Sequence, residues 1–174
     1  MLPAAHAMIA ELETEAATTR RVLARVPDAR LGWRPHPKSM TAGQLAHHVA
    51  SIPGLIARVA GSESFDVADR FRSAEYVSAE SQAAALATLD ASVEAARAAL
   101  ASLDEDASRA TWRMKAGDRE LFALPRLGAM RVLGLSHLYH HRGELVVYLR
   151  LLDVPVPIVY GRSADESPLG PPAA

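Results

Sequence analysis

The chain has 174 residues, enough for one domain with a substantial apolar core, and a formal charge of −1, with 19 Lys plus Arg against 20 Asp plus Glu. That balance argues against a basic field able to hold nucleic acid, and the absence of cysteine excludes disulfides, thiolate ligands and a cysteine nucleophile. No stretch approaches the roughly 18 to 20 apolar residues of a membrane span, and the N-terminus lacks the pattern of a signal peptide. We therefore expect a cytoplasmic protein that binds neither nucleic acid nor membrane.

The apolar residues of four segments recur every three or four positions, the spacing typical of an amphipathic helix. In chain order we predict helices over residues 6–26, 41–60, 78–103 and 125–152. Thr41 and Gln44 have the spacing of a capping box at the start of the second helix, which Pro53 is expected to perturb. Ser78 is the expected cap of the third helix, and Pro125 is the expected first residue of the last.

The segments between these helices are rich in proline, glycine and polar residues. Residues 31–40 contain two prolines and a glycine, which predicts an extended loop across one end of the bundle, anchored by Trp33. Residues 61–77 are expected to form a long connection with a short helical turn around Phe71. Residues 110–123 are expected to form a small hairpin or an irregular loop.

These elements predict an all-α fold, an antiparallel four-helix bundle with the hairpin or loop placed before the last helix. The bundle is expected to occupy residues 1–160. Residues 161–174 are rich in Ser, Pro, Gly and Ala and are expected to form an extended, mobile C-terminal tail.

Two histidines stand four residues apart in the last predicted helix. At that spacing the side chains of His137 and His141 leave the same helix face one turn apart, so both imidazoles can bind one metal ion. The pattern alone is loose, because two histidines at this spacing also occur by chance on a helix surface. A metal site needs a third ligand from another part of the chain.

The second predicted helix offers that ligand. Its apolar face runs through positions 45, 48, 49 and 52, so His48 points with this face and His47 lies about 100° away from it. Three neutral imidazoles leave a divalent metal with open positions for water or substrate, as in catalytic sites. We therefore predict that His48, His137 and His141 bind a divalent metal. The other histidines are expected outside the site: His6, His36, His47 and His140.

Glu144 is also of interest because it lies three positions after His141 and seven after His137. A carboxylate there can be a fourth ligand or can orient an imidazole, and an ion pair with Arg142, Arg150 or a residue of another helix is an equally open interpretation. Large amphipathic side chains on a bundle helix more often pack than contact a substrate. The candidate catalytic or substrate-contacting residues are Tyr139, Arg142, Glu144 and Tyr148, and a packing role for these side chains stays an alternative.

Two motifs carry a resemblance to a known family. Trp33-Arg-Pro-His-Pro-Lys-Ser-Met-Thr-Ala-Gly-Gln-Leu-Ala-His-His-Val-Ala and Tyr139-His-His-Arg-Gly-Glu-Leu-Val-Val-Tyr-Leu-Arg-Leu-Leu-Asp resemble the DinB-like proteins of the DinB/YfiT metalloenzyme superfamily. In that family a histidine in a Leu-x-x-His-hydrophobic-Ala pattern joins a His-x-x-x-His pair to bind a divalent metal. The matching positions here are His48, His137 and His141.

The resemblance also implies properties that the residues alone do not. It implies a bundle of the up-down-down-up type, a homodimer, and zinc or nickel as the metal. Members of the family often have Gln where this chain has Glu144, so the resemblance assigns no ligand role to that residue.

Activities in the wider superfamily include the transfer of low-molecular-weight thiols and a thiol-dependent isomerisation. The leading hypothesis is therefore a metal-dependent transferase or hydrolase that directs a small thiol or water at an electrophilic small molecule. The alternative is a non-catalytic, stress-linked bundle whose histidines bind metal for structure or sensing. A role on DNA has only the family's historical name behind it, and the neutral charge argues against it.

Overall fold

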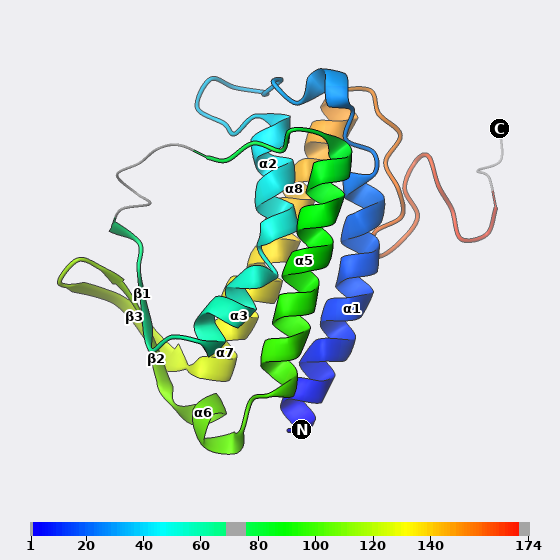
Figure 1. The fold of residues 1–174 in the computed structure, drawn as a ribbon. Helices are drawn as coiled ribbons and strands as arrows, with labels where there is room; N and C mark the ends of the chain where they lie inside the picture. Colours follow the sequence, from blue (N-terminus) through cyan, green and yellow to red (C-terminus); the bar gives the residue numbers. More distant parts are fainter. Residues whose placement is uncertain (1, 69–75, 171–174) are drawn as a thin grey trace.

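The long helices of the protein lie side by side along one axis in a computed structural model that describes residues 2–68 and 76–170 (Figure 1). They are α1 (Pro3–Leu23), α2 (Ala42–Ser51), α3 (Gly54–Ala60), α5 (Gln82–Ala101) and α8 (His137–Leu151). Helix α5 packs against α1, α2 and α3, and α8 packs against α2 and α1. The core between them is formed by fully buried aliphatic side chains, among them Leu12, Leu45, Leu89, Leu138 and Leu145.

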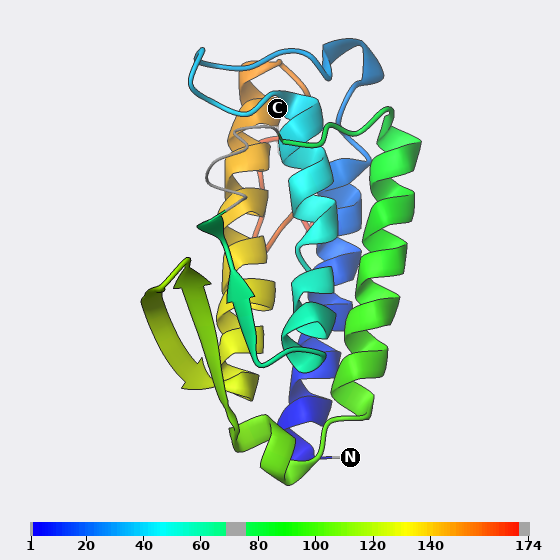
Figure 2. The same cartoon turned by 60° about the vertical axis from the view of Figure 1, so that its left-hand side comes forward.

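The prediction of an all-α four-helix bundle is wrong, because a three-stranded mixed sheet is part of the fold. Strands β1 (Ser64–Asp66), β2 (Thr111–Ala116) and β3 (Arg119–Pro125) lie in the order β1-β2-β3. β1 runs parallel to β2, and β2 and β3 form an antiparallel hairpin. Figure 2 shows this sheet beside the last helical segment, outside the layer of long helices.

The strand that the sequence did not reveal is β1. It has three residues, too few for a period-two pattern, and it pairs with a strand about fifty residues later, Ser64 with Arg113. It falls in the segment expected to be a connection. The helical turn expected around Phe71 lies outside the described residues.

Local signals at the start of α2 are confirmed. Thr41 Oγ1 accepts a hydrogen bond from the Gln44 amide at 3.2 Å, and Gln44 Oε1 accepts one from the Thr41 amide at 2.8 Å, which is the predicted capping box.

The expected perturbation at Pro53 is a break, since α2 ends at Ser51 and α3 begins at Gly54. The predicted cap Ser78 is wrong, because Ser81 accepts from the Ala84 amide and caps α5.

The last helical segment is not one uniform α-helix. Pro125 ends β3, and the segment then runs through α7 (Arg126–Met130), a π-helix (Arg131–Ser136) and α8. Gly134 explains the tight packing at the π-helix, because a Cβ there would lie 2.3 Å from Ile56 Cγ1 on α3. The last helical segment can therefore pack this closely against α3 only because position 134 has no side chain.

The residues after α8 return along the bundle. Arg150 of α8 pairs with Asp165 at 2.5 Å, and Arg25, just after the end of α1, pairs with Glu166 at 2.6 Å, so both regions contact the segment after residue 160. The boundary at residue 160 and the mobility of the tail remain predictions. Among the residues described, there is no helix of the length and apolar character needed to cross a membrane.

Candidate metal centre

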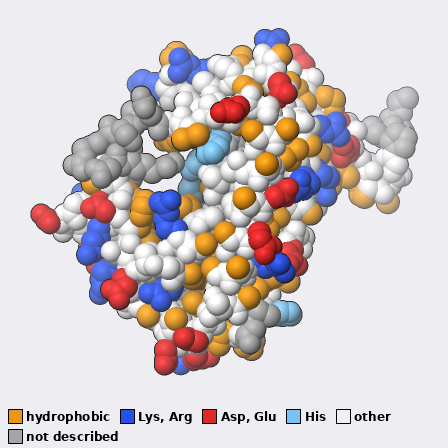
Figure 3. All heavy atoms as spheres, in the orientation of Figure 1, with side chains coloured by type: hydrophobic (Ala, Val, Ile, Leu, Met, Phe, Trp, Pro, Cys, Tyr) orange, Lys and Arg blue, Asp and Glu red, His pale blue; other side chains and the backbone are white. Residues whose placement is uncertain are grey.

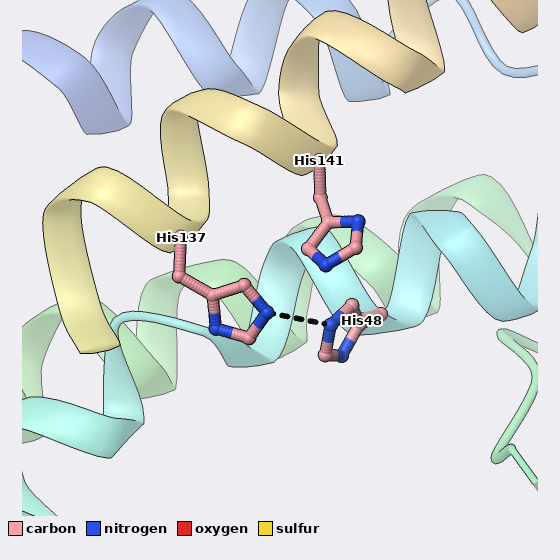
Figure 4. Close-up of side chains that lie close together, drawn as sticks. All are labelled: His48, His137 and His141. Atoms are coloured by element: carbon pink, nitrogen blue, oxygen red, sulfur yellow. Dashed lines mark hydrogen bonds between the residues drawn. The ribbon is translucent and has the colours of Figure 1, made fainter. Parts of the chain in front are cut away.

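Three histidine side chains from two helices point toward one another (Figure 4). His48 comes from α2, and His137 and His141 come from α8. Their ring centroids lie 4.5 to 4.9 Å apart, and one nitrogen from each ring can be chosen so that all three lie within 4.8 Å of one another. All three side chains are half-buried. The structure thus brings together the three residues predicted from helix register.

The geometry of this cluster fits a metal ion. Two nitrogen ligands at about 2.05 Å from a tetrahedral metal are separated by roughly 3.3 Å. The Nε2 atoms of His48 and His137 are 3.2 Å apart. The donor set of three imidazoles suits zinc, nickel and other borderline divalent ions. The cluster is therefore compatible with metal binding, while the identity of the metal stays a prediction.

The two helices that carry the histidines are each held by local devices. The capping box places His48 two turns into α2, and the neighbouring Leu45 and Val49 are fully buried. The contact between Gly134 and Ile56 holds the last segment against α3 just before His137. The position of His48 relative to His137 and His141 is thus set by the packing of two helices and not by a loop.

Glu144 contacts the cluster from its outer side. Its Oε2 lies 2.6 Å from His141 Nδ1, and its Oε1 lies 3.2 Å from Nε2 of the exposed His140. A carboxylate that accepts the Nδ1 proton fixes the imidazole tautomer with Nε2 unprotonated, as second-shell carboxylates of metal sites do. The ion pair with Arg142 or Arg150 left open by the sequence is not formed, because those arginines pair with Glu15 and Asp165.

Two of the candidate catalytic residues face α1 instead of the histidines. Arg142 is 1% exposed and pairs with Glu15 of α1 at 2.6 Å. The Tyr139 hydroxyl donates to Glu11 of α1 at 2.5 Å, and burial together with that hydrogen bond raises the pKa of Tyr139. The helical register explains this placement, because positions 139 and 142 lie three apart, away from the face of 137 and 141.

The other histidines lie outside the three-histidine cluster. His36 accepts a hydrogen bond from the Lys38 amide in the loop before α2, and His6 is exposed near the start of α1. His47 is half-buried next to His48 but on a different side of the helix. His140 takes part only in the outer group with His141 and Glu144.

A pocket of about 400 Å³ opens beside the cluster. Tyr148 lines it, donates its hydroxyl proton to the Met40 carbonyl at 3.2 Å, and has a pKa raised by burial. Figure 3 shows histidine side chains at a hollow beside α2, with Lys and Arg side chains over the loop above it. The pocket is lined by Arg34, Pro37, Lys38, Ser39, Met40, Gln44, Tyr76, His141, Glu144 and Tyr148.

Sequence reasoning missed the pocket residues that precede α2. Arg34 and Lys38 belong to the loop expected to cross the end of the bundle. Their adjacency to the capping box of the helix that carries His48 is the signal that could have drawn attention to them.

Comparison with known sequences identifies the family of the chain. Residues 11–145 match the sequence model of the DinB superfamily, and the chain belongs to that superfamily. No curated protein sequence matches the chain.

Similar folds occur among solved structures. A DinB-like protein from Bacillus subtilis has a TM-score of 0.64 at 18% identity over 88% of this chain and 98% of its own. A DinB-like protein from Bacillus cereus ATCC 10987 has a TM-score of 0.64 at 20% identity over 85% and 92%. A protein assigned to the DinB family from Exiguobacterium sibiricum 255-15 has a TM-score of 0.63 at 18% identity over 91% and 97%. At these identities the likeness concerns the fold alone.

Proposed function

We propose that His48, His137 and His141 hold a divalent metal ion, zinc or nickel, in an enzyme that directs a small thiol or water at an electrophilic small molecule. The observation that carries the proposal is the convergence of three imidazoles with a 3.2 Å separation between two Nε2 atoms. When bound, the metal supplies a positive charge that lowers the pKa of a thiol or water at an open coordination position. The chain has no cysteine, so a thiol substrate must come from outside.

The protein's own residues have separable roles in this proposal. The three histidines hold the ion and leave open coordination positions, because they supply only three ligands. Glu144 fixes the tautomer of His141 through the 2.6 Å contact with Nδ1. Tyr148 lines the pocket and donates its hydroxyl proton to the Met40 carbonyl, so it presents an uncharged side chain to a ligand at neutral pH.

The pocket favours a catalytic site over a purely structural one. Structural metal sites are closed by four protein ligands, whereas catalytic sites keep an open side. His141 belongs to the cluster and also lines the 400 Å³ pocket, which supports the approach of a small molecule from that side. A homodimer is a further prediction, and the described contacts neither require it nor oppose it.

The test is a reaction panel with metal-loaded protein, low-molecular-weight thiols and water as nucleophiles, and activated halides and esters as electrophiles. We expect His48→Ala to lower the rate at least about tenfold, equivalent to about 1.4 kcal/mol of transition-state stabilisation. The matched control is His47→Ala, which removes a neighbouring imidazole outside the cluster. Equal rates for His48→Ala and wild type across the panel would refute the catalytic proposal.

A further inference from the structure

The lining of the pocket beside the histidines is unevenly charged. Arg34 and Lys38 contribute two cationic side chains from the loop before α2, and Glu144 contributes the one carboxylate among the residues that line it. That carboxylate is already engaged, since its two oxygens lie within 3.2 Å of histidine nitrogens. The lining therefore has an excess of positive charge on the side of the loop.

Neither cation is neutralised by a partner in the parts of the chain that the structure describes. Arg34 donates from Nη1 to the Pro37 carbonyl at 3.2 Å, which leaves its other N–H groups for a ligand. Within residues 2–68 and 76–170, no carboxylate forms an ion pair with Arg34 or Lys38. Both side chains are exposed, so a ligand in the pocket can reach them.

The loop that carries these cations is held in place by several contacts. The Ala42 amide donates to the Trp33 carbonyl at 2.7 Å, and the Ser39 amide donates to the His36 carbonyl at 2.9 Å. Trp33 also packs edge-on against Tyr148 of α8, with ring centroids 5.6 Å apart. The positions of the cations are therefore coupled to both helices that carry the histidines.

We infer that this pocket selects small molecules that carry a carboxylate, with Arg34 and Lys38 as the residues that determine specificity. A guanidinium fork matches a carboxylate in a bidentate pair, and an ammonium adds a point charge. Because His141 lines the same pocket, a ligand anchored by its carboxylate at the loop can extend toward the histidine cluster. A volume near 400 Å³ suits a small molecule. The inference rests on the proposed function, because it assigns the substrate class of the same site.

Two thiols of equal chain length test the inference: 3-mercaptopropionate, which carries a carboxylate, and 3-mercapto-1-propanol, which does not. We expect zinc-loaded wild type to bind the acid about tenfold more tightly in calorimetric titrations, a typical value for one charge-assisted contact. The preference should shrink as salt is raised, because both cations are exposed to solvent.

The decisive variant is Arg34→Gln with Lys38→Gln, which keeps polar side chains at both positions and removes both charges. We expect it to bind the two thiols with affinities within about twofold of each other, since the charge-assisted contacts to the carboxylate are lost. The matched control, Arg97→Gln with Arg119→Gln, removes two exposed charges outside the pocket and should keep the preference of wild type. A preference that survives in the Arg34/Lys38 variant would come from zinc chelation by the carboxylate and would overturn the inference.

Failure of the proposed function gives a different result. Zinc affinity is measured first on all proteins, and failure of wild type to bind zinc refutes the metal site. In that case the two thiols are titrated against metal-free protein, so the measured affinity reports the pocket without any contribution from zinc. Equal binding of both thiols by wild type, or no binding of either, overturns the inference about the carboxylate whether zinc binds or not.

Discussion

Glu144 shows how one side chain can act on the centre without being one of its three histidines. Its carboxylate contacts Nδ1 of His141, the nitrogen that does not need to face the cluster. Sequence spacing identified Glu144 as a residue of interest but left its role open between ligand, orienting group and ion-pair partner. The structure shows its partners: Glu144 contacts His141 and His140, while the nearby arginines pair with Glu15 and Asp165.

Removing the Glu144 carboxylate should weaken metal binding without abolishing it. We expect Glu144→Ala to lower zinc affinity about 10- to 100-fold, the usual effect of losing a carboxylate that orients a ligating histidine. Competition with a chromophoric chelator measures the affinity. Glu94→Ala, which removes an exposed carboxylate on α5, is the control and should leave the affinity unchanged. If both variants bound zinc as wild type does, Glu144 would have no orienting role.

Among the helices, the π-helix before His137 is a feature that periodicity could not reveal. The apolar spacing of the sequence predicts a continuous helix from residue 125, because it records which positions face the core and not how closely backbones approach. The approach is set by a pair far apart in sequence, Gly134 and Ile56. The start of α2 could be predicted, in contrast, because all atoms of its capping box lie within four residues.

The same limit explains the sheet. The hairpin of β2 and β3 was one of two forms predicted for its segment, since a turn-rich gap between partly alternating runs is a local signal. Strand β1 has no local signal of comparable strength and exists through its pairing with β2. Structure that depends on neighbouring residues could therefore be predicted from the sequence, whereas pairing between distant segments could not.

Gly134 offers a test of the close approach. Gly134→Ala places a Cβ 2.3 Å from a fully buried Ile56 side chain, so it should destabilise the protein by about 1–3 kcal/mol despite the better helix propensity of alanine. The control is Gly143→Ala on α8, where an added Cβ would meet no atom within 4 Å apart from its chain neighbours and the backbone of its own helix. It should stabilise by about 0.5–1 kcal/mol. Urea denaturation measures both, and a stabilised Gly134→Ala would contradict the packing described.

At the scale of the whole molecule, a polar network centred on the buried Arg142 joins three distant parts of the chain. Arg142 of α8 donates to Thr19 Oγ1 of α1 at 3.1 Å and to the Tyr160 hydroxyl of the C-terminal segment at 2.6 Å. The Tyr160 hydroxyl donates in turn to Glu15 at 3.0 Å. The network lies on the side of α8 that faces α1, so it is separate from the histidine cluster and holds the helix that carries the ligand pair.

Loss of the buried cation should be costly. We expect Arg142→Ala to reduce the free energy of unfolding by about 3–5 kcal/mol, because it leaves the carboxylate of Glu15, which is 7% exposed, without its partner. Arg150→Ala breaks the exposed pair with Asp165 and should cost no more than about 1 kcal/mol. Equal losses in chemical denaturation of the two variants would show that the network does not hold the helices together.

The central claim is that His48, His137 and His141 form one metal centre in this member of the DinB superfamily. The most direct measurement is the metal content, by mass spectrometry, of protein purified without an affinity tag. Wild type should contain about one zinc or nickel ion per chain, and the triple variant His48→Ala/His137→Ala/His141→Ala close to none. The matched triple variant His6→Ala/His36→Ala/His47→Ala should keep the metal content of wild type. Equal metal content in wild type and the first triple variant would contradict the account.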